Sequence, residues 1–355
     1  MKRQVHKFGG ASVRDAQAVR NVGRIVEDLC IRGIHPIVVV SAMAKSTNAL
    51  EAIWSALPNG GGGQNVCAAF LDFHASVAAE LELPSEVLDA DVAAFMTVAE
   101  RLTGQPADDE AYDALVGFGE RFSTRLVHAH LAQRGLRAAW QSAWHWIKTD
   151  AHHRAAAVDV ASTGTAVRAA LEHLGEGFAV TQGFVGGSAD GKPTTLGREG
   201  SDYTGALLAE ASGAERLVVW KDVEGVMTGD PRRWPFAEKV NALDHVTAER
   251  MSRAGAGVLH PSTMAPLQRS GIPLEVRSFQ HPERTGTVIS SAQPDQPLPR
   301  LWAFEGEGDQ AVVRCLADSP HGMVDEWNRA FPERSADSTT ADPDIPGCYQ
   351  LGFTR

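Results

Sequence analysis

The sequence predicts an α/β fold built on a parallel sheet, and three features of its first forty residues carry that prediction. Residues 3–8 have the pattern of a short strand, which Gly9 and Gly10 interrupt. An amphipathic pattern with helical spacing follows from Val13 to Leu29. The β-branched run 37–40 then resembles a strand buried on both faces. A strand, a glycine turn, a helix and a buried strand form a βαβ unit, whose strands are parallel.

The boundaries of that first helix have local signals. Ser12 and Asp15, three residues apart, predict a capping box at its start, and Gly33 predicts its end. After a glycine-rich connector over 58–64, the sequence is helical in pattern from about 65 to 135.

The second half of the chain repeats the alternation of helices and buried strands. Helical patterns cover 155–174 and 203–213, and strand-like runs follow each of them at 178–181 and 216–220. Asp, Pro and Ser cluster over 335–346, which predicts a loop or a poorly ordered tail.

Composition excludes several classes of protein. The 355 residues suit two modest domains or one large one, and 43% hydrophobic residues suffice for a core. Lys and Arg number 33 against 44 Asp and Glu, a formal charge of −11, which argues against non-specific nucleic-acid or membrane binding. The start of the chain lacks a secretory pattern and no apolar run reaches about 18 residues. We therefore expect a soluble, cytoplasmic enzyme or binding protein.

Three segments suggest an anion-binding site. Lys7 precedes the glycine turn, where free backbone N–H groups and a helix N-terminus favour a phosphate. In the segment 197–203, Arg198 offers a planar fork for a carboxylate, Ser201 is a candidate helix cap and Asp202 could orient a lysine. The segment 220–232 places charged residues after a strand, at the sheet edge where α/β folds bind nucleotides. Each segment alone is also compatible with an ordinary turn or a solvated charged loop.

Other patterns point away from competing chemistry. The segment 186–193 resembles a phosphate-binding loop but ends in Pro193, so we interpret Asp190-Gly191 as a hairpin turn. No GxGxxG follows a strand, and the pair His152-His153 lacks ligand spacing. The four cysteines form no CxxC pair, so neither a disulfide framework nor a zinc site is expected.

Taken together, six blocks in order resemble the aspartate kinase family of the amino-acid kinase superfamily. The blocks are KFGGASV at 7–13, VSAMAKSTN at 40–48, GFGERFST at 117–124, GREGSDY at 197–203, WKDVEGVMTGDPR at 220–232 and VLHPST at 258–263. The resemblance implies a three-layer α/β/α sandwich with a largely parallel sheet. It also implies a catalytic domain over 1–293, with an aspartate side and an ATP side, and a short extension over 294–355.

The resemblance further implies ATP-dependent phosphorylation of the β-carboxylate of L-aspartate, the first step toward lysine, threonine and methionine. It implies catalytic roles for Lys7, which neutralises the phosphoryl group, and for Asp202, which holds Lys7. It places the amino acid at Ser41, Thr47, Glu120, Arg198 and Ser201, with Glu120 on the ammonium and Arg198 on a carboxylate. It places ATP at Lys7, Gly9, Gly10, Ser12, Lys221, Asp222, Met227, Asp230, Arg232, Gly257 and Val258. Mg²⁺ is expected to arrive with ATP, without protein ligands, and a homo-oligomer is an open expectation.

Three departures from the family pattern leave alternatives open. Ala11 stands in place of a usual threonine, and Gly257 in place of a common nucleotide-contacting lysine, which Lys221 could partly replace. Only 355 − 299 = 56 residues follow Pro299, too few for two ACT domains, so we expect at most one partial module and little feedback by lysine or threonine. The alternatives to an aspartate kinase are a kinase for another amino acid and a non-catalytic binding subunit.

Overall fold

The computed structural model describes residues 2–59, 63–106, 108–255, 259–292, 299–305, 312–317 and 319–353. The chain divides into two compact units, each described here by itself. Unit 1 comprises Met1–Asp222 with Phe279–Pro282, and unit 2 comprises Val223–Ser278 with Glu283–Arg355.

Unit 1 is built on five parallel strands, which lie in the order β3-β5-β2-β1-β8. Their bounds are β1 Lys2–Phe8, β2 Ile34–Val40, β3 Ala138–Gln141, β5 Phe178–Gln182 and β8 Leu217–Lys221. The central strands β2 and β5 are buried over almost their whole length, as the β-branched run at 37–40 predicts.

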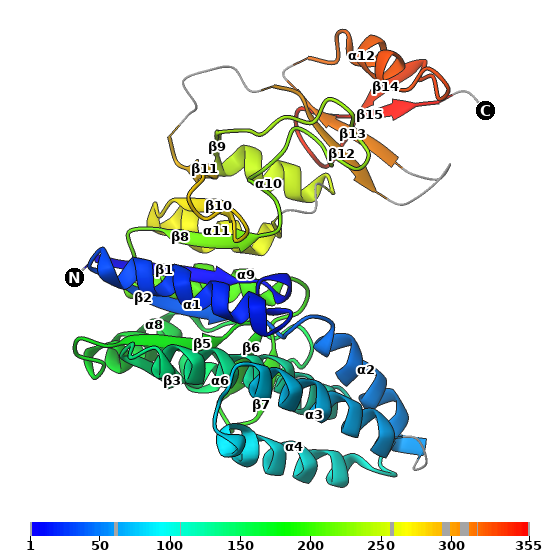
Figure 1. Cartoon of the computed structure of the whole chain (residues 1–355). Helices are drawn as coiled ribbons and strands as arrows, with labels where there is room; N and C mark the ends of the chain where they lie inside the picture. Colours follow the sequence, from blue (N-terminus) through cyan, green and yellow to red (C-terminus); the bar gives the residue numbers. More distant parts are fainter. Residues whose placement is uncertain are drawn as a thin grey trace. The chain divides into compact units, whose positions relative to one another are not determined.

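Helices cover both faces of this sheet (Figure 1). Helices α1 and α6 contact β2 and each other on one face, and α9, with α8 packed on it, contacts β1 and β2 on the other. Their bounds are α1 Ala16–Ile31, α6 Phe118–Gln133, α8 Val160–Glu172 and α9 Gly200–Ser212. The predicted three-layer α/β/α architecture is therefore confirmed.

The remaining elements of unit 1 lie beside the sandwich. A small sheet has the order β4-β6-β7, and its β6–β7 hairpin turns at Gly191 with a φ of +80°, which confirms the predicted Asp190-Gly191 turn. The bounds are β4 Lys148–Thr149, β6 Val185–Ser188, β7 Pro193–Thr195, α2 Ser46–Ala56, η2 Leu57–Asn59, α3 Gly63–Glu80, η3 Ser85–Leu88, α4 Asp89–Leu102, α5 Asp109–Val116 and α7 Ala143–Trp146. Of the connector expected at 58–64, residues 60–62 lie outside the described residues.

Two sequence-based expectations about helix starts are wrong. Ser12 does not cap α1; it lies in the short 3₁₀ helix η1 (Gly10–Val13), and Asp15 itself caps α1 by accepting the Ala18 N–H at 2.8 Å. Likewise Glu199, not Ser201, occupies the N-cap position of α9, and no side chain caps that helix. At α1 the short 3₁₀ helix takes up Ser12, so the α-helix starts later than expected, whereas α9 starts at Gly200, so Ser201 lies inside its first turn.

Unit 2 contains three strands in the order β10-β11-β9 and a second sheet in the order β12-β13-β15-β14. Their bounds are β9 Ala242–Asp244, β10 Leu274–Ser278, β11 Thr287–Ser290, β12 Leu301–Glu305, β13 Val312–Leu316, β14 Ser338–Ala341 and β15 Cys348–Gly352, with α10 His245–Arg253, α11 Pro261–Ser270 and α12 Met323–Ala330. The second sheet is antiparallel throughout.

The C-terminal residues are more ordered than their composition predicts. The strands β12 and β13 pair antiparallel, and β14 lies inside the segment 335–346 that we expected to be a loop or a poorly ordered tail. Trp302 and Trp327, both at most 2% exposed, pack with Trp234 into a small core that stabilises this sheet. The predicted boundary at residue 293 falls beside residues that the structure does not describe, and it stays a prediction.

Candidate active site

A cavity of about 510 Å³ lies within unit 1, next to the carboxyl ends of its parallel strands. Gly10 follows β1, Ser41 follows β2 and Phe184 follows β5, so three strand ends contribute to its wall. The lining residues are Lys7, Gly10, Ser41, Ala42, Ala44, Thr47, Glu51, Tyr112, Glu120, Arg154, Phe184, Thr195, Gly197, Arg198, Glu199, Gly200 and Ser201. Six of the seven residues expected to be catalytic or to bind the amino acid are among them, and the seventh, Asp202, contacts Lys7.

Two lysines converge on the carboxylate of Asp202. Lys7 Nζ lies 2.5 Å from Asp202 Oδ1, and Lys221 Nζ lies 3.0 Å from Oδ2. The Asp202 side chain is fully buried, and burial alone would raise its pKa, but the two ammonium groups hold that pKa below its usual value. Burial opposes the charge of Lys221 as well, yet Asp202 and Glu199 raise its pKa. Glu199 also lies 3.9 Å from Lys221 Nζ, so Lys7, which lines the cavity, is the ammonium group of this cluster best placed to meet an incoming phosphate.

The glycine turn brings the end of β1 close to the segment after β2. A Cβ on Gly10 would lie 2.7 Å from Ala42 O, so no larger residue fits there without a shift of backbone. A Cβ on Gly9 would lie 3.7 Å from Lys7 Nζ. Ser12 is 1% exposed and its hydroxyl donates to Trp220 O at 3.3 Å, so its proton is used inside the fold.

Glu120 is a buried carboxyl group that forms no ion pair within the part of the chain that the structure describes. Its Oε1 accepts the Ala42 N–H at 3.0 Å, whereas its Oε2 accepts no hydrogen bond from the described residues. Burial raises the pKa of Glu120 to about 8, against the lowering effects of that N–H and of Lys7. A buried, half-satisfied carboxyl that lines a cavity is suited to receive a cationic ligand.

Arg198 lies on the loop that leads into α9. Gly197 and Glu199, on either side of it, have φ values of +75° and +56°, so the loop makes a tight turn before the helix. The Arg198 side chain is exposed to the cavity and forms no ion pair within the described residues. Ser201 follows in the first turn of α9, where the positive end of the helix dipole also favours an anion.

Ser41 and Thr47 complete the amino-acid side of the wall. The Ser41 N–H donates to Phe8 O at 3.0 Å and its carbonyl accepts from the Ser123 hydroxyl at 2.7 Å, which fixes its backbone. Thr47 lies in the first turn of α2 and is half-buried. The backbone of Ser41 is therefore well held, and both residues line the cavity.

The residues expected on the nucleotide side fall into different units. Lys221 and the exposed Asp222 end unit 1, whereas Met227, Asp230 and Arg232 belong to unit 2. Asp230 accepts from the Arg232 side chain at 3.0 and 2.9 Å, and that arginine lowers the pKa of Asp230. Gly257 and Val258 lie outside the described residues. For all seven of these residues, contact with the nucleotide stays a prediction.

Sequence reasoning missed a polar cluster of Glu51, Tyr112 and Arg154 that also lines this cavity. Tyr112 donates to Glu51 Oε1 at 2.8 Å, and burial together with this bond raises the pKa of Tyr112 to about 12. The Arg154 guanidinium lies 4.1 Å from the centre of the Tyr112 ring and bonds Asp109 at 3.2 Å. The only sequence signal nearby is the pair His152-His153, which we considered solely as a metal site. These residues come from three separate segments, which no local pattern connects.

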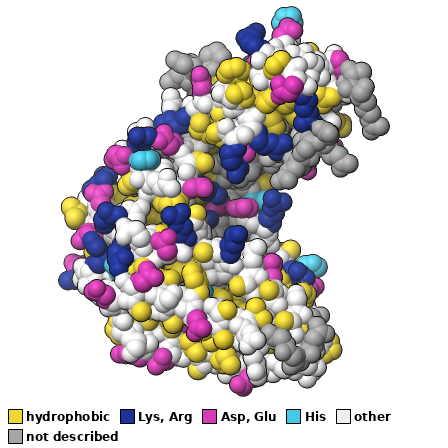
Figure 2. All heavy atoms as spheres, turned by 45° about the vertical axis from the view of Figure 1, so that its right-hand side comes forward, with side chains coloured by type: hydrophobic (Ala, Val, Ile, Leu, Met, Phe, Trp, Pro, Cys, Tyr) yellow, Lys and Arg dark blue, Asp and Glu magenta, His cyan; other side chains and the backbone are white. Residues whose placement is uncertain are grey.

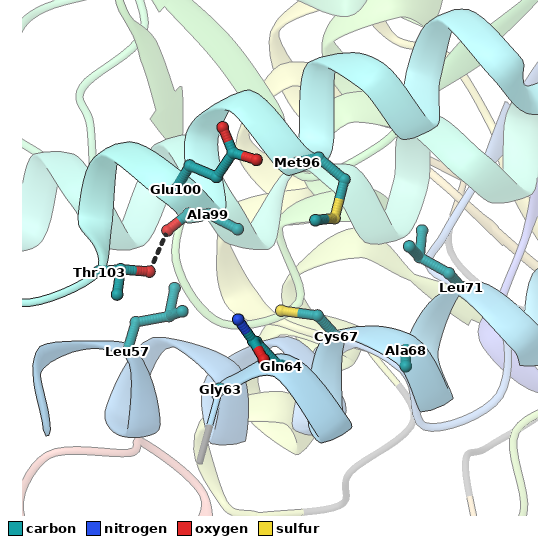
Figure 3. Close-up of a pocket in the computed structure, with 10 residues that line it drawn as sticks. All are labelled: Leu57, Gly63, Gln64, Cys67, Ala68, Leu71, Met96, Ala99, Glu100 and Thr103. Atoms are coloured by element: carbon teal, nitrogen blue, oxygen red, sulfur yellow. Dashed lines mark hydrogen bonds between the residues drawn. The ribbon is translucent and has the colours of Figure 1, made fainter. Parts of the chain in front are cut away.

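A second cavity, of about 280 Å³, differs in chemistry. It lies between α3 and α4, and Cys67, Leu71 and Met96 point into it (Figure 3). Its ten lining residues include no lysine, arginine or histidine, so it is not suited to a phosphate. The 510 Å³ cavity is therefore the candidate active site.

Three further observations describe the surface and the described residues as a whole. On the face drawn in Figure 2, Lys and Arg side chains are interspersed with Asp and Glu side chains. Among the described residues, no three His, Cys, Asp or Glu side chains gather in a way that could hold a metal ion. None of the helices described is both long and apolar enough to cross a membrane.

Comparison with known proteins adds to this geometry. Residues 2–278 match the model of the amino acid kinase family. The lysine-sensitive aspartokinase 3 of Escherichia coli (strain K12) is 35% identical over 305 residues, which cover 84% of this chain and 67% of that protein. The aspartokinase of Geobacillus stearothermophilus is 30% identical over 312 residues, which cover 87% of this chain and 64% of that protein. This chain thus spans about two thirds of the length of these two relatives.

Solved structures give the same result. The crystal structure of E. coli aspartokinase III in complex with aspartate and ADP (R-state) matches with a TM-score of 0.79 at 31% identity, over 100% of this chain and 79% of that chain. An aspartate kinase of Clostridium acetobutylicum shares the fold, with a TM-score of 0.72 at 20% identity, over 98% of this chain and 77% of that chain. From the family match and these relatives, the chain belongs to the amino acid kinase family and, within it, to the aspartokinases.

Proposed function

We propose that this chain transfers the γ-phosphoryl group of ATP to the β-carboxylate of L-aspartate, forming 4-phospho-L-aspartate and ADP. This reaction is the first step toward lysine, threonine and methionine. The observation that carries the proposal is one cavity in which Glu120, Arg198 and Lys7 all line the wall. An amino diacid presents an ammonium group and two carboxylates, which is the complement of those three charges.

The acceptor is held through its charged ends. The unpartnered Oε2 of Glu120 accepts the substrate ammonium, and the guanidinium of Arg198, with Ser201 at the start of α9, binds the α-carboxylate. Ser41 and Thr47 contribute hydroxyl contacts. The β-carboxylate is then left for the reaction at Lys7.

The transfer step needs positive charge and alignment rather than a base. The β-carboxylate is ionised at neutral pH, so its oxygen attacks phosphorus without losing a proton, and ADP leaves with the bridging oxygen. Lys7 and the N–H groups of the Gly9–Gly10 turn stabilise the charge that builds on the phosphoryl oxygens. Asp202 keeps Lys7 in place, and Lys221 adds a second ammonium group beside it.

ATP enters as its Mg²⁺ complex, so the metal ion is part of the substrate. Within unit 1, the glycine turn, Lys221 and Asp222 hold the nucleotide, and Ser12, whose hydroxyl donates to Trp220 O, supports that turn from inside the fold. For Met227, Asp230, Arg232, Gly257 and Val258, the proposed nucleotide contacts rest on the resemblance to the family alone. The carboxylate of Asp222, exposed and close in sequence to Lys221, is available to a hydrated Mg²⁺ or to the ribose.

Trapping of the acyl phosphate tests the proposal. Purified protein with L-aspartate, ATP, Mg²⁺ and hydroxylamine is expected to form aspartyl hydroxamate, and Lys7→Ala is expected to form almost none. No hydroxamate above the Lys7→Ala level would overturn the proposal. ADP release that is faster with another amino acid than with aspartate would identify a kinase for that amino acid. ATP binding measured by calorimetry, without turnover, would identify a non-catalytic subunit.

A further inference from the structure

Asp113 is a buried carboxylate that does not line the cavity. Its hydrogen bonds hold together two segments of the cavity wall. It lies on α5 with no exposed surface, and no lysine or arginine side chain bonds it within the described residues. Its two oxygens instead accept hydrogen bonds from four donors that lie more than 35 residues away in the sequence. These donors are His153 Nδ1 at 2.9 Å, the Arg154 N–H at 3.0 Å, the Thr195 N–H at 3.0 Å and the Thr195 hydroxyl at 2.6 Å.

The first segment that Asp113 holds is the strained one at Arg154. This residue has a φ of +69°, in the left-handed region that non-glycine residues avoid. The hydrogen bond from its N–H to Asp113 supports that conformation, and its side chain consequently lies over the Tyr112 ring at the cavity wall. Without the carboxylate, the backbone at Arg154 is expected to relax, so that the Arg154 side chain moves away from its place at the cavity wall.

The second segment leads directly to Arg198. Thr195 ends β7, three residues before Arg198, and both its N–H and its hydroxyl are bonded to Asp113. The two segments also contact each other, because Ala156 N–H donates to Thr195 O at 2.9 Å and a Cβ on Gly197 would lie 3.3 Å from Arg154 O. Arg198 itself has no ion pair in the described structure, so the backbone of this loop decides where its side chain can reach.

We propose that Asp113 is a positioning residue for acceptor specificity: it fixes the loop that aims Arg198 at the substrate carboxylate. This inference rests on the proposed function, because it takes the ligand of Arg198 to be a carboxylate of the acceptor amino acid. Asp113 acts through Thr195 and Arg154 and does not line the cavity. Loss of the Asp113 carboxylate therefore weakens the binding of the amino acid much more than the binding of the nucleotide.

The test compares two buried aspartates of unit 1. Asp113→Asn keeps the shape of the side chain but replaces an acceptor oxygen with an NH₂ group that faces N–H donors. Asp91→Asn is the matched control, because Asp91 is also buried and is bonded to Arg121 at 2.5 Å and Arg125 at 2.9 Å, away from the cavity lining. The measurements are kcat, KM for aspartate, KM for ATP, and Tm.

Asp113→Asn is expected to raise KM for aspartate roughly tenfold, as for the loss of a hydrogen bond to a charged group, with KM for ATP within about twofold. Asp91→Asn is expected to lower Tm and leave the ratio of the two KM values near that of the wild type. Equal changes in both KM values for Asp113→Asn, or a change in Tm alone, would overturn the proposal. Wild-type protein without aspartate-dependent turnover would instead overturn the proposed function, and this inference with it.

Thr195 supplies a second route if Asp113→Asn does not fold. Thr195→Val removes only the hydroxyl donor, and it is expected to raise KM for aspartate about threefold. Thr195→Ser keeps the donor and should lie closer to the wild type than Thr195→Val. Val and Ser variants with the same KM for aspartate would contradict the role of this hydrogen bond.

Discussion

Asp202 and Glu120 are two fully buried carboxyl groups of one unit, and the protein treats them in opposite ways. Asp202 is surrounded by two ammonium groups of the protein, so its pKa is lowered. Glu120 accepts one backbone N–H and bonds no cation among the described residues, and burial raises its pKa to about 8. The comparison teaches that burial does not fix the charge of a carboxyl group; the cation beside it does. At Asp202 the fold provides that cation, whereas at Glu120 we infer that the substrate provides it.

The largest effect is expected at the lysine of the Asp202 cluster. Lys7→Met removes the ammonium group that faces the phosphoryl oxygens, so kcat should fall by roughly 10²–10³-fold. Steady-state ADP release measures this change. Lys192→Met is the control, because Lys192 bonds Glu110 at 2.7 Å on the surface and should leave kcat within about twofold. A fall in kcat of less than about tenfold for Lys7→Met would mean that Lys7 and Asp202 do not contribute to phosphoryl transfer.

Arg198→Lys tests the carboxylate end of the same cavity. Lysine keeps the charge but loses the planar fork, so KM for aspartate should rise roughly 10–100-fold. KM for ATP should change much less, because the nucleotide does not use this side chain. Equal increases in both constants would mean that Arg198 does not bind the amino acid.

The pKa of Glu120 predicts how the reaction depends on pH. The ammonium group of aspartate binds the ionised carboxylate, which is the minor form of Glu120 in the free protein below about pH 8. Consequently kcat/KM for aspartate should rise about tenfold from pH 7 to pH 8.5, while KM for ATP stays nearly constant over that range. A flat profile for aspartate would show that Glu120 is already ionised, or that it does not meet the ammonium group.

The smallest effect concerns stability and contrasts the two carboxyl groups directly. Because the folded-state pKa of Glu120 is above its ordinary value of 4.5, the folded protein binds this proton more tightly than the unfolded chain does. Its contribution to stability is full below about pH 4.5 and is lost as the pH rises through 8. Glu120→Gln, which resembles the protonated form, should therefore gain roughly 2–5 °C in Tm at pH 9 and almost nothing at pH 5.

Asp202→Asn provides the opposite sign in the same thermal experiment. The lowered pKa of Asp202 means that its ionised form stabilises the fold above its ordinary value of 3.8 and that this contribution is lost in acid. The asparagine variant should therefore have a lower Tm than the wild type at pH 7 and above. Equal Tm shifts of the same sign for both variants would contradict the distinction between the two sites.

Most of the sandwich could be predicted from local patterns. The run at 37–40, the glycines after β1 and the helical spacing up to Leu29 each encode their element within a few residues, because period and turn chemistry are local properties. The errors occurred where neighbours distant in sequence decide. Ser12 resembles a cap but bonds the carbonyl of Trp220, and the polar segment 335–346 contains a strand because β15 pairs with it.

By itself, the sequence determined the order of the elements and, through its motifs, the residues most suited to bind an amino acid and a phosphate. Only the tertiary structure decided their charges and partners. Desolvation and the nearest ion control a pKa, and both come from segments that the chain brings together, such as Asp202 with Lys7 and Lys221. Asp113 had no signal in the sequence for the same reason, since all four of its donors lie about 40 to 80 residues away along the chain.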